Sequence, residues 1–274
     1  MEQGLRHFFQ PVAVVDISVI IPTFDRARLL VRAIRSVLGQ SRPVLEVIVV
    51  DDGSTDGTEA AVAALGEERV RYVRQERRGA NAARNLGATL AGGDWLAFQD
   101  SDDYWAPDKI ERQAEALDGA EAPCDAGFCG VLEFSGENAG YFPKGLPPDP
   151  TIFAGERHIV DLVLRRNLIS TQTLLIRKGT FAALGGFDAR LPRFQDWDLA
   201  VKLLSSARVL YLPEPLVIAG KGADSITRNY RAGLIARRQI WQNHRQLFRR
   251  HPAAAFHFRR DLAMRDLAGL ARGR

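Results

Sequence analysis

Short apolar runs alternate with segments of helical periodicity over the first hundred residues of the chain. Four runs rich in Val, Ile and aromatic residues have the length and composition of strands: 17–21, 46–50, 70–73 and 94–98. Apolar residues recur at helical spacing between them, at 26–38, 58–65 and 81–90. Helices between fully apolar strands require crossover connections. The sequence therefore predicts an α/β fold with a mainly parallel central sheet flanked by helices.

The pattern is looser in the rest of the chain. The expected elements are a helix that Pro107 starts, a strand at 126–134, a long loop at 135–154, a helix at 156–166, a strand at 171–176, a short helix, a helix that carries 196–199, and a last strand at 209–212. We expect one domain at 14–220 and a basic, mostly helical extension at 221–274.

Charge is distributed unevenly. From residue 228 onward the chain has twelve arginines against Asp261 and Asp266, a surplus of ten, so the net charge of +4 leaves residues 1–227 at −6. A basic extension indicates an anionic partner, such as substrate phosphates, a lipid surface or an acidic protein, or else a solvated helical face. The segment 234–248 fits an amphipathic helix on a membrane, on the body or on a second subunit of a homodimer. Nucleic acid is not expected, because aromatic residues are not regularly interleaved with the arginines.

Membrane-spanning and secretory signals are missing from the pattern. No stretch approaches the roughly 18 uninterrupted apolar residues of a spanning helix, and the first residues lack the features of a signal peptide. We therefore expect a cytoplasmic protein, with peripheral contact at the inner face of the membrane left open. Cys124 and Cys129 have no partners at zinc spacing, which indicates reduced, structural thiols.

Three carboxylates follow the apolar run 94–98 within four positions: Asp100, Asp102 and Asp103. These negative charges repel one another, and crowding them is unfavourable unless a cation offsets the repulsion. Oxygen ligands at a strand end suit Mg²⁺ or Mn²⁺ shared with the phosphates of a substrate. The alternative is that Asp102 or Asp103 caps the helix that Pro107 starts.

Unusual residues follow three of the expected strands, at Pro22-Thr23, at Asp51-Asp52 and at 100–103. Ligands of parallel α/β sheets bind at the carboxyl ends of the strands, so we expect these residues to converge on one site. The alternative for the segment at Asp51 is turn formation, since Asp, Gly and Ser are common turn residues.

Five motifs occur in one order over about 180 residues: Ser18-Val-Ile-Ile-Pro-Thr-Phe24, Val49-Val-Asp-Asp-Gly-Ser-Thr-Asp56, Gly79-Ala-Asn-Ala-Ala-Arg-Asn-Leu-Gly87, Asp100-Ser-Asp-Asp103, and Gly185-Gly-Phe-Asp188 with Gln195-Asp-Trp-Asp-Leu199. In these motifs the chain resembles the family 2 glycosyltransferases of the GT-A fold, over roughly residues 16–220. The resemblance implies transfer of a sugar from a nucleotide-diphosphate sugar, with a UDP-sugar as the expected donor, and a Mn²⁺ or Mg²⁺ cofactor.

The resemblance also implies roles for single residues. The expected donor-binding residues are Pro22, Thr23, Asp25, Asp51, Arg84, Asp100, Ser101 and Asp102, and the expected metal ligands are Asp102 and Asp103. Asp51 would accept a hydrogen bond from the base or ribose. Arg84 and Asn85 could face the diphosphate. The alternatives are that Arg84 points outward beside an Asn near a helix end, or that Arg78 binds the diphosphate instead. Lys221 and Arg228 could reach the same diphosphate from a loop.

Asp196 matches the catalytic base of the family, which deprotonates an acceptor hydroxyl on a glycan, a lipid-linked sugar or a protein. The acceptor oxygen attacks the anomeric carbon from the face opposite the diphosphate, so the resemblance implies inversion at that carbon. The family commonly has Glu before this Asp, and this chain has Gln195. The alternative for Asp196 is a helix cap.

Two other functions fit parts of the pattern. One is a non-catalytic nucleotide-sugar-binding or scaffold protein. The other is a sugar-nucleotide pyrophosphorylase, although this N-terminal region lacks the glycine-rich loop with Arg and Lys that such enzymes usually have. A dehydrogenase is not expected, because no Gly-x-Gly-x-x-Gly follows the first strand.

Overall fold

The computed structural model describes residues 16–135, 138–220 and 230–272. Its first half consists of β1 (Ile17–Thr23), α1 (Ala27–Leu38), β2 (Glu46–Asp51), α2 (Thr58–Ala63), β3 (Val70–Arg74), α3 (Ala80–Leu90), β4 (Trp95–Phe98), β5 (Tyr104–Trp105) and α4 (Lys109–Asp118). The expected strands and helices up to residue 98 are confirmed.

The second half continues with β6 (Ala126–Ser135), β7 (Asn138–Phe142), β8 (Thr151–Phe153), α5 (Arg157–Arg165), the 3-10 helix η1 (Thr171–Thr173), β9 (Leu174–Arg177), α6 (Lys178–Ala183), α7 (Gln195–Ser206), β10 (Val209–Gly220), α8 (Tyr230–Asn243), α9 (Arg245–Arg250) and α10 (Pro252–Arg272). The loop predicted at 135–154 is wrong, because β7 pairs with the end of β6 and β8 pairs with the start of β10. The strand predicted at 171–176 begins only at Leu174, after a turn of 3-10 helix.

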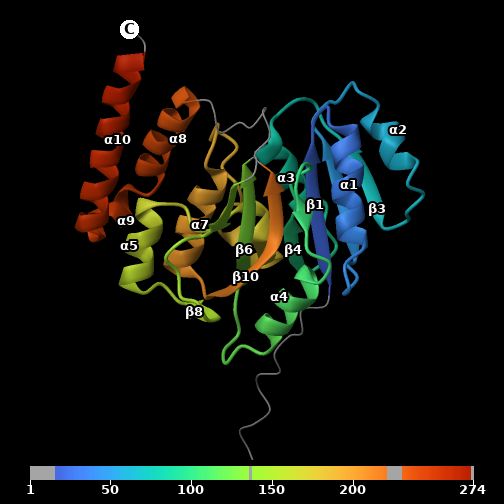
Figure 1. The fold of residues 1–274 in the computed structure, drawn as a ribbon, viewed down its shortest axis with the longest axis horizontal. Coiled ribbons are helices and arrows are strands. Elements are labelled where there is room, and N and C mark those ends of the chain that lie inside the picture. Colours follow the sequence, from blue (N-terminus) through green and yellow to red (C-terminus); the bar gives the residue numbers. More distant parts are fainter. Residues whose placement is uncertain (1–15, 136–137, 221–229, 273–274) are drawn as a thin grey trace, which may run out of the picture.

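One sheet runs through the molecule, with the strand order β3-β2-β1-β4-β9-β6-β10-β5. The pairs β1–β2, β1–β4, β2–β3 and β6–β10 are parallel, whereas β9 is antiparallel to both β4 and β6. The central strands β3, β2, β1 and β4 are thus parallel, and β9 joins them to the parallel pair β6–β10. The sheet as a whole is mixed, because β5, β7 and β8 add antiparallel pairs. In Figure 1 the blue half with β1 to β3 and the half with β6 and β10 lie side by side.

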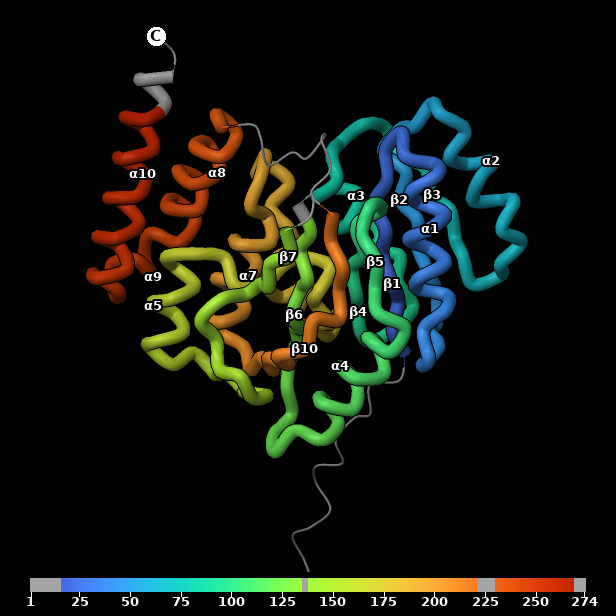
Figure 2. Tube along the Cα trace, in the orientation of Figure 1, coloured from blue at the N-terminus to red at the C-terminus, as the bar shows by residue number. Residues whose placement is uncertain are grey.

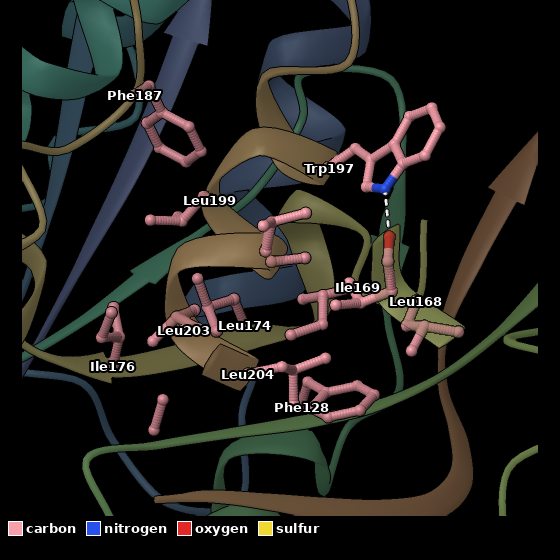
Figure 3. Packing of buried hydrophobic residues seen from close by; sticks show 14 of the residues in the cluster. Phe128, Leu168, Ile169, Leu174, Ile176, Phe187, Trp197, Leu199, Leu203 and Leu204 are labelled. Carbon is pink, nitrogen blue, oxygen red and sulfur yellow. Dashed lines mark hydrogen bonds between the residues drawn. The ribbon is translucent and has the colours of Figure 1, made fainter. Parts of the chain in front are cut away.

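Helices cover both faces of the sheet. Alternate residues of β1 belong to two hydrophobic clusters, since Ile17, Val19 and Ile21 pack with α1 and α4 while Ile20 packs with α3. A strand presents successive side chains to opposite faces, so this division requires apolar cover on each side. Figure 3 shows part of the cluster that contains Ile20, at residues later in the sequence. There Leu199, Leu203 and Leu204 of α7 lie over Phe128 and Leu174 of the sheet.

The helices α8 to α10 pack against α5 and α7 at one end of the molecule (Figures 1 and 2). Trp241, Phe248 and Phe258 form an aromatic cluster in which the rings of Trp241 and Phe248 are 4.5 Å apart and those of Phe248 and Phe258 are 4.9 Å apart. Phe258 also contacts Trp197 of α7, with ring centres 5.7 Å apart. The segment 234–248 is therefore docked on the body, as one of the sequence alternatives has it, and shares the core of α7.

Within the described ranges, no helix combines the length and apolar character that crossing a membrane requires. Cys124 and Cys129 are buried and unpaired with each other, in agreement with the expected structural thiols. The helix expected at Pro107 begins at Lys109, and β5 separates it from Asp103. The proposed cap by Asp102 or Asp103 is therefore wrong.

Replacing Phe248 by alanine tests whether the C-terminal helices belong to the core. Phe248 is 1% exposed, so we expect Phe248→Ala to lower the free energy of unfolding by about 3–5 kcal/mol in denaturant titrations. Phe256→Ala is the matched control, since Phe256 on α10 is 65% exposed, and it should change stability by no more than about 0.5 kcal/mol. Equal, small effects of both changes would contradict the packing.

Candidate active site

The carboxyl ends of β1, β2 and β4 bring the expected site residues to one edge of the sheet. Thr23 at the end of β1 is paired with Asp51 at the end of β2, and Ile20 is paired with Phe98 at the end of β4. The acidic segment 100–103 follows directly. The predicted convergence is confirmed, and it results from the parallel pairing of these three strands.

Asp51 is fully buried and accepts hydrogen bonds through both oxygens. Its Oδ1 accepts from the backbone N and the hydroxyl of Ser54, at 2.9 and 2.6 Å. Its Oδ2 accepts from the hydroxyl of Tyr72, and Arg74 Nη1 lies 3.5 Å away. Burial and the neighbouring Asp51 raise the pKa of Tyr72 to about 12. The turn chemistry that was one alternative is therefore present, and Asp51 is also tied to β3.

Asp52 holds the connection between β3 and α3. Its Oδ1 accepts from Gln75 Nε2 and from the backbone N of Arg78, each at 2.7 Å. Its Oδ2 accepts from the backbone N of Gly79 at 2.9 Å. These bonds fix the start of α3, and α3 in turn carries Arg84.

The loops after β1 and β2 are bonded to each other. Asp25, which has a left-handed φ of 48°, donates its backbone N–H to the hydroxyl of Ser54 at 2.8 Å. Asp25 Oδ1 accepts from the backbone N of Thr55 at 2.7 Å, and Asp56 Oδ2 accepts from the backbone N of Ala27 at 2.9 Å. Because several bonds join the two loops, they form one preorganised rim of the site.

Each carboxylate of the acidic segment has a different partner. Asp100 Oδ1 is 2.5 Å from Arg84 Nη2, and Asp102 Oδ2 is 2.8 Å from Arg26 Nη1. Asp103 Oδ2 accepts from Gln172 Nε2 at 2.9 Å. Burial, together with the charges of Asp100 and Asp102, raises the pKa of Asp103 to about 8. The three carboxylates thus remain electrostatically crowded even with these partners.

This donor set fits a divalent cation that is shared with a substrate. Over the described part of the chain, no group of three or more His, Cys, Asp or Glu side chains converges on one point. Mg²⁺ in nucleotide sites usually takes only one or two carboxylates and completes its shell with phosphate and water. Asp102, with its side chain 41% exposed, is open to such a cation, and Asp103 lies buried beside it.

Polar atoms at this edge of the sheet have capacity left for a ligand. Thr23 Oγ1 and Arg84 Nε are buried and accept or donate no hydrogen bond within the described residues. Buried polar atoms are normally satisfied, so such atoms need an explanation. Pro22 and Ser101 are buried at the same strand ends. The expected donor-binding residues therefore lie together.

Asp196 lies in the first turn of α7. Its Oδ2 accepts from Asn167 Nδ2 at 2.8 Å, and its Oδ1 accepts from the backbone N of Trp197 at 2.9 Å. The N-cap residue of α7 is Phe194, and no side-chain hydrogen bond caps the helix. The alternative that Asp196 caps the helix is therefore wrong.

The surroundings of Asp196 perturb its acidity. Burial raises the pKa of Asp196 to about 6, and the charges of Arg84 and Asp100 both act on the same carboxyl. The guanidinium of Arg84 lies 5.7 Å from the ring centre of Phe187, and Phe187 and Asp196 line one small cavity. Asp196 therefore lies close to the Arg84–Asp100 pair of the acidic segment.

Two asparagines of α3 hold the segment that precedes α7. Asn85 Nδ2 donates to the carbonyl of Phe187 at 2.8 Å, and the backbone N of Phe187 donates back to Asn85 Oδ1 at 3.0 Å. Asn81 Nδ2 donates to the carbonyl of Leu191 at 3.1 Å. A Cβ at Gly186, where φ is 62°, would lie 2.7 Å from Asn85 Oδ1. The expectation that Asn85 faces a diphosphate is wrong, because its amide is committed to this clamp.

The C-terminal helices reach α7 through Asp198. This buried carboxylate is bonded to Lys202 Nζ at 2.8 Å, His244 Nε2 at 2.9 Å and Asn243 Nδ2 at 3.0 Å. Burial alone would raise the pKa of Asp198, but these three hydrogen bonds outweigh it and lower the pKa. Asn243 also donates to Asp188 Oδ2 at 3.1 Å, so α8 supports both sides of the Asp196 segment.

The family description "Glycosyl transferase family 2" matches residues 18–177, which is more than half of the chain. The chain belongs to glycosyl transferase family 2. The succinoglycan biosynthesis protein ExoO of Rhizobium meliloti is 39% identical over 132 residues, covering 48% of this chain and 38% of ExoO. The chain covers 28% to 38% of the length of four curated relatives, ExoO among them.

Solved glycosyltransferase structures share the fold. S. aureus TarS 1-349 in complex with UDP-GlcNAc has a TM-score of 0.65 at 20% identity, over 82% of this chain and 66% of that protein. The mannosyltransferase PcManGT of Pyrobaculum calidifontis, in complex with GDP-Man and Mn²⁺, has a TM-score of 0.65 at 19% identity, over 98% and 79%. The predicted GT-A fold, with its sheet flanked by helices, is confirmed.

Several residues at the site were not found by sequence reasoning. Each of these residues contacts an expected site residue, but lies outside the motifs or at a position to which no role was given: Arg26, Tyr72, Asn167 and Gln172. Only the folded chain brings them near their partners, which lie 21 to 76 residues away. Lys221 and Arg228, which were expected to reach a diphosphate, lie outside the described residues.

The carboxyl of Asp196 should titrate near pH 6. Asn167→Ala removes a hydrogen bond that favours the ionised form, so this change should raise the pKa of Asp196 further. Carbon-13 NMR of the aspartate carboxyl groups measures both values, with Asp196→Asn to assign the resonance. A midpoint of about 4, the ordinary value for Asp, would show that burial does not perturb this group.

Proposed function

We propose that the protein is an inverting glycosyltransferase that moves a sugar from a nucleotide-diphosphate sugar to a hydroxyl of a glycan, a lipid-linked sugar or a protein. The observation that carries the proposal is the position of Asp196. This half-buried carboxyl has a raised pKa and lies within electrostatic reach of the Arg84–Asp100 pair at the ends of the parallel strands.

The donor would lie along the rim formed by the loops after β1 and β2. Pro22, Thr23 and Asp25 would shape the pocket for the base and ribose, and Asp51 would supply an acceptor at its floor. TarS and PcManGT are described in complexes with UDP-GlcNAc and GDP-Man, which supports a nucleotide-sugar donor. We favour a UDP-sugar.

Arg84 would contact the diphosphate. Its Nη2 holds Asp100, while its buried Nε has no partner within the described residues. A guanidinium offers several N–H donors in a fixed plane, so one Arg can hold a carboxylate and a phosphate at once. Ser101 and Asp100 would complete this part of the donor site.

Asp196 would act as the general base. A pKa of about 6 leaves the carboxyl largely ionised at neutral pH but basic enough to take a proton from the acceptor hydroxyl. The acceptor oxygen would attack the anomeric carbon as the bond to the diphosphate breaks on the opposite face. The configuration at that carbon would therefore invert, with Asn167 orienting the carboxylate through its bond to Oδ2.

Asp102 and Asp103 would hold Mn²⁺ or Mg²⁺. Such a cation, when bound, would offset negative charge on the departing nucleoside diphosphate. PcManGT is described with Mn²⁺, and the crowding that raises the pKa of Asp103 is the condition that a cation relieves.

Donor turnover tests the proposal directly. Purified protein with Mn²⁺ and UDP- or GDP-sugars should release nucleoside diphosphate, at least by slow hydrolysis. Asp196→Asn should abolish release and transfer while leaving donor affinity in calorimetry nearly unchanged, because it removes the proton acceptor and keeps the shape.

Asp149→Asn is the control, since Asp149 is exposed in the loop before β8 and should leave turnover unchanged. Donor binding without release in the unaltered protein would favour the alternative of a non-catalytic nucleotide-sugar-binding protein. Full turnover by Asp196→Asn would reject Asp196 as the base.

The proposal includes contact of the C-terminal region with the inner, cytoplasmic face of a membrane. Phe256, Met264 and Leu267 of α10 are 61% to 65% exposed, and their spacing places them on one face of the helix. Arg260 lies exposed on the same face, and the two acidic residues of α10 are paired with arginines. An apolar stripe beside arginines fits an anionic lipid surface.

Vesicle sedimentation tests this contact. The protein should bind vesicles of phosphatidylcholine mixed with phosphatidylglycerol and not vesicles of phosphatidylcholine alone. Serine at positions 256, 264 and 267 together should remove most of the binding, whereas Leu45→Ser, at an exposed apolar residue of another region, should not. Concentration-dependent dimerisation that the triple change abolishes, without vesicle binding, would assign the stripe to a homodimer instead.

A further inference from the structure

Arg26 holds a fixed backbone position at the edge of the acidic segment. It is the residue directly before α1, and its carbonyl accepts the backbone N–H of Leu30 in the first turn. Its neighbours on both sides, Asp25 and Ala27, are bonded to the loop after β2. The backbone is therefore anchored at the donor rim, and the long side chain is the part that can move.

The side chain of Arg26 is paired with the most accessible carboxylate of the segment. Arg26 Nη1 lies 2.8 Å from Asp102 Oδ2, and the two side chains are 33% and 41% exposed. Asp100 is held by the buried Arg84, and Asp103 is held by Gln172 in the interior. Exposed ion pairs of this kind are weak, so the pair with Asp102 is the contact of the three that exchanges most readily.

We propose that Arg26 is an exchanging residue that neutralises Asp102 while the site is empty, releases it to the divalent cation, and then binds the diphosphate of the donor. This inference rests on the proposed function. Asp103 follows Asp102 directly in the chain and is buried, so Arg26 at Asp102 places a positive charge beside both expected ligands.

The chemistry of the two partners favours this exchange. A carboxylate oxygen can accept from a guanidinium or coordinate a hard cation, but the two cations repel each other at one carboxylate. A phosphate is an equally good partner for a guanidinium, through paired and charge-assisted hydrogen bonds. A bound diphosphate would therefore offer the guanidinium of Arg26 a new hydrogen-bonding partner, and Asp102 would become free to coordinate the cation.

One consequence is positive coupling between the cation and the nucleotide. Each ligand favours the state in which Arg26 has left Asp102, so each raises the affinity for the other. Without the Arg26 side chain, the cation no longer competes for Asp102, and the nucleotide loses one contact. The two affinities should therefore change in opposite directions.

Binding measurements on the full chain test the exchange. Free Mn²⁺ is measured by electron paramagnetic resonance without nucleotide and with saturating UDP or GDP, and nucleotide affinity is measured by calorimetry with Mn²⁺. We expect Arg26→Gln to bind Mn²⁺ alone more tightly, to bind the nucleotide more weakly, and to lose most of a coupling that is typically about 5-fold or more.

Arg28→Gln is the matched control. It removes the same charge two residues further along the chain, where the side chain is exposed, and so reports the long-range effect of charge alone. Tighter Mn²⁺ binding and weaker nucleotide binding by Arg26→Gln beyond that control support the exchange. Values equal to the control, or a loss of affinity for both ligands, overturn it.

The measurements also separate this inference from the proposed function. If the unaltered protein binds neither Mn²⁺ nor any nucleoside diphosphate, the proposed function and the exchange fail together. If it binds both and Arg26→Gln behaves like Arg28→Gln, only the exchange fails.

Discussion

The repulsion among Asp100, Asp102 and Asp103 at the end of β4 is the constraint on which the arrangement of the site depends. Each carboxylate is drawn to a different element, Asp100 to α3, Asp102 to the start of α1 and Asp103 to η1. The helices α1 and α3 lie on opposite faces of the sheet, and η1 directly precedes β9. A cluster that is unfavourable in isolation therefore connects the helices around the strand ends.

Long-range hydrogen bonds give the same edge of the sheet its rigidity. Asp52 fixes the start of α3, Asn85 of α3 clamps the backbone at Phe187, and Asn243 of α8 is bonded to both Asp188 and Asp198. The chain of contacts runs from the acidic loop after β2 to the C-terminal helices. Those helices share the core of α7, so they support the segment that carries Asp196 and are more than a basic appendage.

Local patterns predicted the elements, whereas tertiary contacts decided the partners. The β-branched runs and the helical spacing up to residue 98 are local, and parallel pairing then places the strand ends together. The strand β7 was missed because Asn138–Phe142 contains Gly and lacks an apolar alternation, and its pairing with β6 stabilises it. Asn167 and Gln172 could not be assigned, since nothing in their own neighbourhood indicates a partner 29 or 69 residues away.

Asp196 and Asp198 show what the structure adds to a base that was assigned from the sequence. The two carboxylates are separated by one residue in the first turn of α7, and in the sequence only the resemblance to the family distinguishes them. Burial raises the pKa of Asp196 to about 6, whereas Lys202, His244 and Asn243 outweigh burial and lower the pKa of Asp198. A base must be ionised near neutral pH and must still bind a proton with useful strength. The carboxylate of Asp198 is held by Lys202, His244 and Asn243 and joins α7 to α8, so in the proposed function the role of the base goes to Asp196.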